Sequence, residues 1–231
     1  MKHRTTPHPA KRLGLVACLL LAACEQPQQA PENPTPAPAK SVSSPDRYLW
    51  ADFAEGRAEL SNGVKATPGW YAEDKRDVAF DGAHFEEGAM RLTGTLRKTH
   101  ESRYGGITVS LAAASAEGAD MSAYGTLKLV LASSQAGHKL QVRLIGPNDV
   151  AMFRGCYPFA TIAPTATPDS HVITLRAELF PALEWCKDLR LSFADTLKNL
   201  RAVEIIDATL PTDAQTPSAI DFSLKTVSFE R

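Results

Sequence analysis

The residues of this 231-residue chain that could perform catalysis are scattered. The sequence contains no glycine-rich phosphate loop, no GxSxG element around a serine nucleophile and no HExxH zinc signature. Four histidines follow residue 23, and no two of them are four residues apart: His84, His100, His138 and His171. Metal-assisted and nucleophilic catalysis therefore have little support in the sequence.

Paired acidic residues are the other candidates for chemistry. Glu73 and Asp74 are adjacent, as are Glu86 and Glu87. Glycoside hydrolysis needs two carboxyl groups about 5 to 10 Å apart that face one bond, whereas neighbouring acids on a turn point to different sides. We expect both pairs to be solvated surface and Asp207 to end a strand. The chain is thus predicted not to be an enzyme, with a polysaccharide-acting enzyme as an alternative.

The N-terminus has the features of an export signal. Residues 1–12 carry four basic and no acidic side chains, and residues 13–23 form an apolar run that is too short to span a membrane. Its end, Leu21-Ala22-Ala23-Cys24, resembles the bacterial lipobox, which implies cleavage after residue 23 and lipidation of Cys24. Acyl chains on that cysteine would anchor the protein to a membrane.

The segment after Cys24 predicts a tether. Residues 24–46 are rich in proline, glutamine, alanine and serine and lack the large apolar side chains of a core. Loss of the signal removes four basic residues and leaves a net charge of about −5, with no basic footprint for nucleic acid. We expect a lipoprotein of the bacterial envelope, on the outer membrane and facing the periplasm or the cell surface. Its domain is expected over residues 47–231.

Two cysteines remain after the lipidated one. Cys156 and Cys186 would lie in an oxidising compartment, which favours a disulfide that closes a loop of about 30 residues. A catalytic cysteine or a metal thiolate would need a nearby histidine or a CxxC spacing, and neither thiol has one.

Period-two alternation of apolar residues predicts an all-β, antiparallel β-sandwich of the jelly-roll type. The clearest strands lie at 107–111, 126–131, 138–144, 203–205 and 220–229, the last with a bulge. We expect 126–131 and 138–144 to form a hairpin. Weaker strands are expected at 48–53, 78–80, 89–96, 150–153, 172–175 and 189–193. Residues 70–71 are assigned to a loop and 196–200 to one helical turn.

The order of these features resembles the galactose-binding-like jelly rolls, which include family 11 carbohydrate-binding modules and the complex I intermediate-associated proteins. The resemblance rests on residues 104–111, 120–127, 172–180, 200–206 and 220–229. It implies a binding role rather than catalysis, without a cofactor. Such modules often hold a structural calcium ion, for which Asp52, Glu55 and Asp221 could supply oxygen ligands. Lys225 and Thr226 stand where relatives often carry aspartates, which argues against that ion.

A recognition surface is expected on the polar side of the strands. Sugar binding uses flat aromatic rings against the pyranose and planar hydrogen-bonding groups for its hydroxyls. The candidate ligand-binding residues are Tyr104, Gln141, Arg143, Arg154 and Tyr157. The resulting hypothesis is a non-catalytic, carbohydrate-binding-like domain; the alternative is a protein-interaction or assembly factor of the envelope. The expected partners are the membrane and a glycan or an envelope protein.

Overall fold

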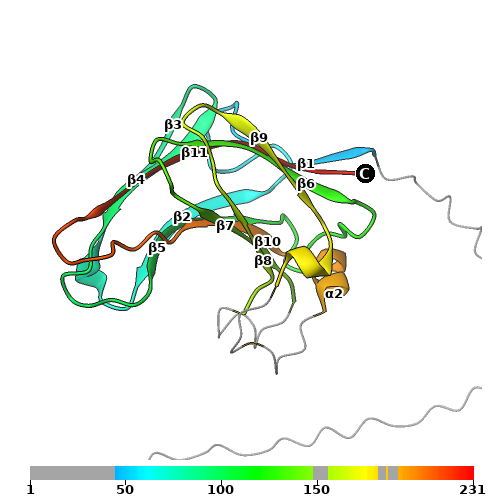
Figure 1. Cartoon of the computed structure of the whole chain (residues 1–231). Coiled ribbons are helices and arrows are strands. Elements are labelled where there is room, and N and C mark those ends of the chain that lie inside the picture. Colours follow the sequence, from blue (N-terminus) through cyan, green and yellow to red (C-terminus); the bar gives the residue numbers. More distant parts are fainter. Residues whose placement is uncertain (1–44, 148–155, 182–185, 187–191) are drawn as a thin grey trace, which may run out of the picture. The chain divides into compact units, whose positions relative to one another are not determined.

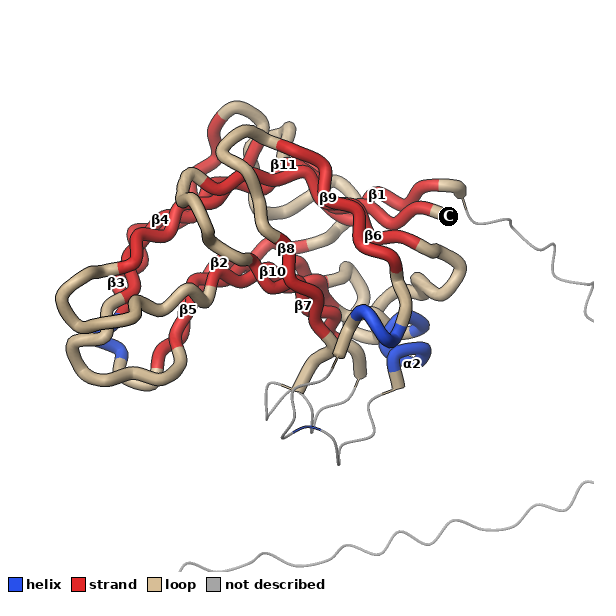
Figure 2. Tube along the Cα trace, viewed as in Figure 1, coloured by secondary structure: helices blue, strands red, loops and turns tan. Residues whose placement is uncertain are grey.

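The computed structural model describes residues 45–147, 156–181, 186 and 192–231 (Figure 1). The expected signal segment, Cys24 and most of the expected tether lie outside these residues. The described residues from 45 onward belong to one compact unit. Its described part is an all-β antiparallel sandwich, as predicted, and strands form most of its regular secondary structure (Figure 2).

One layer of the sandwich is a six-stranded sheet. Its order is β3 (Val78–Glu86), β4 (Ala89–Leu96), β11 (Ser218–Glu230), β6 (Thr126–Ser133) and β9 (Asp169–Thr174), and β1 (Arg47–Asp52) also pairs with β11. The register of β11 shifts between Leu224 and Thr226. This shift confirms the predicted bulge, which keeps Val227 and Phe229 on the buried side after the extra residue.

The second layer is a five-stranded sheet. Its order is β2 (Lys65–Ala72), β5 (Gly105–Ala112), β10 (Ala202–Asp207), β7 (Leu140–Ile145) and β8 (Phe159–Ile162). The strands alternate between buried and partly exposed residues; in β7, Leu140, Val142 and Leu144 are buried, and Gln141 and Arg143 are half-buried. One face of this sheet therefore covers the core, and the other presents polar side chains outward.

The core lies between the two sheets. The alternate leucines of β6 meet those of β7 and the apolar side of β11 in one cluster of buried residues. Trp50 belongs to this cluster with no exposed surface, as expected. Its indole Nε1 donates a hydrogen bond of 3.1 Å to the Leu111 carbonyl, which links β1 of one sheet to β5 of the other.

Two expectations about the strands are wrong. β6 and β7 do not form a hairpin, because β6 pairs with β11 and β9 whereas β7 pairs with β10 and β8. The chain between them crosses from one sheet to the other, so that both apolar sides face the same core. Residues 70–71 belong to strand β2 and not to a loop. Pro68 and Gly69 obscure that strand in the sequence, and proline fits there because β2 is an edge strand.

Helical structure in the described residues is limited to short segments. α2 (Phe193–Lys198) begins after Ser192, whose hydroxyl accepts a hydrogen bond from the Asp195 amide. It starts three residues earlier than the predicted turn and takes Phe193 out of the expected strand. Single turns of 3₁₀ helix lie at Lys75–Asp77 and Ala177–Leu179. No helix among the described residues is long and apolar enough to cross a membrane.

The buried carboxylate of Asp77 joins the turn before β3 to the loop between β4 and β5. The side chain accepts hydrogen bonds from the Thr99 hydroxyl at 2.8 Å, the His100 amide at 3.1 Å and the Ser102 amide at 3.3 Å. The His100 ring nitrogen Nδ1 lies 3.0 Å away. Burial alone would raise the pKa of Asp77, but hydrogen bonds from Ser102, His100 and Thr99 outweigh it and hold the pKa below its usual value.

We expect this carboxylate to make folding sensitive to acid. Because the pKa of Asp77 is lower in the folded state, its stabilising contribution is present above about pH 4 and is lost as the pH falls through the folded pKa. Asp77→Asn should destabilise the protein at pH 7 and flatten the decline in stability between about pH 4 and 2. Urea unfolding at several pH values measures both effects. An unchanged acid profile in Asp77→Asn would contradict this role.

Candidate functional site

The outward face of the five-stranded sheet carries a row of polar and aromatic residues. In the strand register, Glu204 of β10 lies between Ser110 of β5 and Arg143 of β7, and Arg143 lies next to Phe159 of β8. Neighbouring strands place such partners about 5 Å apart. Four consecutive strands thus contribute one side chain each to a continuous strip.

Arg143 is at the centre of this strip. Its guanidinium group lies 3.5 Å from the Glu204 carboxylate, measured from Nη1 to Oε2, and donates a hydrogen bond of 3.1 Å from Nη2 to Oε1 of Gln141. The two charged side chains are only 17% and 20% exposed. The ion pair therefore holds the planar guanidinium group in place at the surface of the sheet.

Two tyrosines share the electrostatic environment of this ion pair. Burial raises the pKa of Tyr71, and the nearby positive charge of Arg143 offsets part of that rise. Burial, together with the negative charge of Glu204, raises the pKa of Tyr157 to about 12. Both phenols therefore stay protonated near neutral pH and can donate hydrogen bonds. We call Tyr71, Gln141, Arg143, Tyr157 and Glu204 the Arg143 cluster.

The pKa of Glu204 is also shifted by its surroundings. Burial raises its pKa, and the charge of Arg143 lowers it in part. The Thr108 hydroxyl also lies near this carboxylate and favours its ionised form. The Thr108 hydroxyl and the Glu204 carboxylate do not form a hydrogen bond, however. The Thr108 oxygen is therefore buried without a hydrogen-bond partner among the described residues. A ligand hydroxyl or a water molecule would complete this group.

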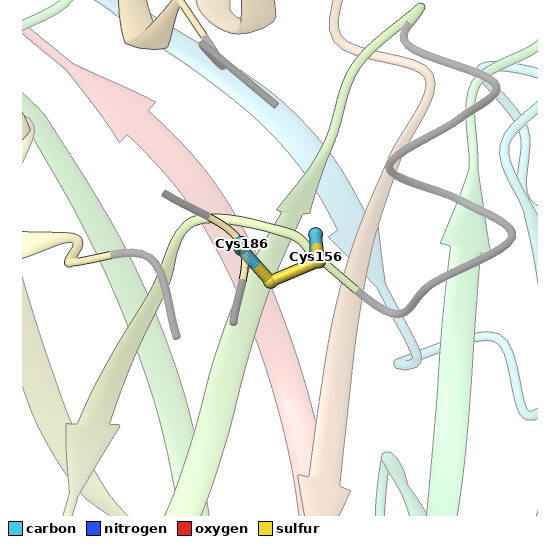
Figure 3. The surroundings of a disulfide bond; sticks show 2 residues. All are labelled: Cys156 and Cys186. Carbon is cyan, nitrogen blue, oxygen red and sulfur yellow. A yellow bond between two sulfur atoms is a disulfide. The ribbon is translucent and has the colours of Figure 1, made fainter. Parts of the chain in front are cut away.

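A disulfide holds the segment that carries Tyr157. Cys156 and Cys186 are bonded, as predicted, with their Cα atoms 5.5 Å apart (Figure 3). Both are buried, and Tyr157 follows Cys156 directly, two residues before β8 begins. The covalent bond therefore fixes the chain next to one of the aromatic members of the Arg143 cluster.

Gly106 makes room for the ring of Tyr71. A Cβ atom at position 106 would lie 3.0 Å from Cε1 of Tyr71 and 2.9 Å from the Asp207 carbonyl oxygen. Real Cβ atoms rarely come so close to a neighbour, so Tyr71 lies over the space that this glycine leaves empty. The sequence shows the glycine pair at 105–106, but not the ring that it accommodates.

Gly106→Ala should therefore disturb the cluster. We expect a loss of about 1 to 3 kcal/mol of unfolding free energy, as for other overpacked sites, and a displaced Tyr71 ring. Denaturant unfolding and the NMR signals of the Tyr71 ring report these effects. Gly125→Ala is the matched control, because a Cβ there would meet nothing within 4 Å. Equal stability of the two variants would contradict the account.

The structure brings together three of the five residues proposed from the sequence. Gln141, Arg143 and Tyr157 belong to the Arg143 cluster. Tyr104 is exposed and precedes β5, where its carbonyl oxygen accepts a hydrogen bond from the Glu73 amide. Arg154 lies outside the described residues. Whether any of these residues binds a ligand stays a prediction.

Two members of the cluster are not among the five candidate ligand-binding residues. The sequence places Tyr71 near the expected recognition surface but in a loop, and it places Glu204 in a strand with no further role. The position of Glu204 did carry a signal, because a single acidic residue among Val203, Ile205 and Ile206 must face away from the core or be paired.

The residues suggested as calcium ligands make other contacts. Asp221 is bonded to Arg91 through both oxygens, Asp52 accepts a hydrogen bond from the Ala54 amide, and Glu55 pairs with Arg57. No group of three or more His, Cys, Asp or Glu side chains in the described part of the chain is arranged to hold a metal ion. These residues do not fit a calcium site.

Comparison with known proteins defines the fold. No family model matches the chain, and no curated protein matches it in sequence. Among solved structures, it is similar to the family 11 carbohydrate-binding module of the cellulosomal cellulase Lic26A-Cel5E of Clostridium thermocellum. The identity is 11%, the TM-score is 0.51, and the match covers 81% of this chain and 96% of the module.

A second solved structure supports the same assignment. The family 11 module from Clostridium thermocellum in complex with a β-1,3-1,4-mixed-linked tetrasaccharide matches with 12% identity and a TM-score of 0.51, over 81% of this chain and 97% of the module. The chain thus has the jelly-roll fold of these modules. Similarity at this level of identity concerns the fold and leaves the ligand open.

Proposed function

We propose that the protein is a non-catalytic glycan-binding lipoprotein that uses the outward face of its five-stranded sheet. The observation that carries the proposal is the Arg143 cluster. It combines a fixed guanidinium group, an amide and a carboxylate on the adjoining strands β7 and β10 with two protonated phenols, one on edge strand β2 and one just before β8. These groups match the hydroxyls of a sugar with donors and acceptors and its apolar face with aromatic rings.

The ion pair favours an uncharged glycan. The positive charge of Arg143 is balanced by Glu204 at 3.5 Å, so the cluster as a whole offers an anionic group little attraction. A net charge of about −5 after loss of the expected signal segment would also repel polyanions over distance. The fold of family 11 modules, one of which is solved with a mixed-linked tetrasaccharide, is consistent with this choice of ligand.

A binding role accounts for the chemistry of Glu204 better than catalysis does. This carboxylate is tied to Arg143 within the cluster. Glycoside hydrolysis would need a second carboxyl group about 5 to 10 Å away across a bound glycosidic bond. The cluster contributes aromatic, amide and guanidinium groups instead, which position a ligand without cleaving it.

Anchoring to the envelope is part of the proposal and rests on the sequence alone. The lipobox-like residues 21–24 would place an acyl-modified cysteine at the mature N-terminus. The proline-rich residues up to 46 would then hold the sandwich away from the membrane. Such an arrangement suits a protein that presents a binding face to polysaccharide at the periplasmic or outer side of the outer membrane.

Affinity electrophoresis tests the proposed function. The protein is run through gels that contain mixed-linked β-glucan, xylan, cellulose derivatives or polygalacturonate. We expect one or more neutral polysaccharides to retard it, and Arg143→Met to abolish at least nine-tenths of the retardation, because a charged hydrogen-bond donor is worth about 1.5 to 3 kcal/mol. Arg47→Met is the matched control, since Arg47 lies on the other sheet in an exposed ion pair with Glu230.

Two outcomes would overturn the proposed function. Either no gel retards the wild-type protein, or Arg143→Met and Arg47→Met both migrate as the wild type does in every gel. Retention by polygalacturonate alone would instead show that the ligand is an anionic glycan and that the charge argument is wrong.

A further inference from the structure

A pocket of about 240 Å³ lies on the outward face of the six-stranded sheet, on the opposite layer from the Arg143 cluster. The turn between β3 and β4 forms one side, and residues 166–168 before β9 form another. Its floor comes from β4, β11 and β6. The lining residues that matter here are Glu86, Arg91, Ser134, Pro168, Ser223 and Lys225.

An ordered array of charges builds this pocket. Arg91 donates two parallel hydrogen bonds to Asp221, from Nε at 2.7 Å and from Nη2 at 2.8 Å, and a third of 2.8 Å from Nη1 to Glu86. The Ser134 hydroxyl also donates to Oδ2 of Asp221, at 2.7 Å. Because the geometry is bidentate, Arg91 and Asp221 hold fixed orientations in the pocket.

Several polar groups of the pocket remain available. A guanidinium group has five N–H donors, and the three hydrogen bonds of Arg91 leave two of them over. Lys225 forms no ion pair with another described residue, and the Ser223 hydroxyl makes no hydrogen bond within the described part of the chain. Among the described residues, hydrogen bonds reach one of the two Glu86 oxygens, and Glu87 adds a further carboxylate to the lining.

The mixture of charges selects the class of ligand. An anion would meet the carboxylates of Glu86, Glu87 and Asp221, and a cation would meet Arg91 and Lys225. A neutral polyhydroxyl compound avoids both conflicts, because each hydroxyl donates to a carboxylate and accepts from an ammonium or guanidinium group. Drug-sized ligands occupy pockets of about 300 to 1,000 Å³, so this smaller pocket suits a single sugar ring.

We propose that the pocket binds one neutral sugar unit, such as the end of a saccharide chain. Lys225, Ser223 and the free N–H groups of Arg91 donate to its hydroxyls, and Glu86 accepts from them. Pro168 and Ala132 provide the apolar side against which the ring packs. This second site is separate from the proposed function, because no residue of the Arg143 cluster contributes to it.

NMR titration with monosaccharides tests the proposal. The ¹⁵N-labelled protein is titrated to about 100 mM with glucose, galactose and mannose, and with glucuronate and glucosamine as charged comparisons. We expect at least one neutral sugar to give saturable shifts at the amides of Ser223, Lys225 and Ala132. Lys225→Met should weaken that binding about tenfold, whereas Lys128→Met, on the same sheet outside the pocket, should not.

The two sites can be told apart in the same experiment. Arg143→Met should leave the shifts at the pocket unchanged, and Lys225→Met should leave the retardation by polysaccharide gels unchanged. The proposal is overturned if no neutral sugar gives saturable shifts at these amides, if glucuronate or glucosamine binds more tightly there, or if Lys225→Met binds as the wild type does. Thermal unfolding of Lys225→Met shows that the variant is folded.

Discussion

Trp50→Ala is expected to lower the free energy of unfolding by about 3 to 5 kcal/mol, the usual cost of removing a large aromatic side chain from a core. Trp50 has no exposed surface and packs edge-on against Phe229, with ring centroids 5.6 Å apart. The substitution also removes the hydrogen bond from the indole to the Leu111 carbonyl, which joins the two sheets. Denaturant unfolding followed by circular dichroism measures the loss.

Trp70→Ala is the control for this prediction. Trp70 lies on edge strand β2 and is 39% exposed, so its removal opens less of the core to water. We expect a clearly smaller loss of stability than for Trp50→Ala. Equal losses in the two variants would mean that Trp50 does not hold the sheets together as described.

Removal of the disulfide should have the second large effect. The bond closes a loop with a sequence separation of 30, for which the chain-entropy model gives about 3 to 4 kcal/mol. Cys156→Ala with Cys186→Ala should lower the unfolding free energy by that amount. Polysaccharide retention should also fall, because Tyr157 follows Cys156 directly and loses its fixed position.

The single variants make this prediction specific. If the bond is responsible, Cys156→Ala and Cys186→Ala should each lose about as much stability as the double variant, since either one breaks it. Losses that add up across the two positions would indicate packing of the side chains instead. A double variant within 1 kcal/mol of the wild type would contradict the prediction.

The sequence predicts the sandwich because alternation is local and strong. Apolar residues stand at every second position of β7, at Leu140, Val142 and Leu144, and the structure buries all three. The bulge in β11 was also predictable, since Val227 and Phe229 return to the buried side after a change of phase. The pairing of cysteines needed only the compartment and a count of thiols.

The partners of the strands could not be predicted in the same way. Alternation shows which face of β6 or β7 is apolar, but not which strand lies next to it. The two strands expected to form a hairpin lie in opposite sheets, and each turns its apolar face to the core. The members of the candidate site could not all be predicted for the same reason. Tyr71 and Glu204 join Arg143 through the register of β2, β5, β10 and β7, which brings together residues more than 60 positions apart.

The central claim is that a glycan binds at the Arg143 cluster. The most direct measurement is a ¹⁵N NMR titration of the protein with an oligosaccharide of whichever polysaccharide retards it most. We predict saturable shifts concentrated at the amides of Ser110, Gln141 and Arg143, and their disappearance in Arg143→Met. Shifts confined to other parts of the protein, or none at all, would contradict it.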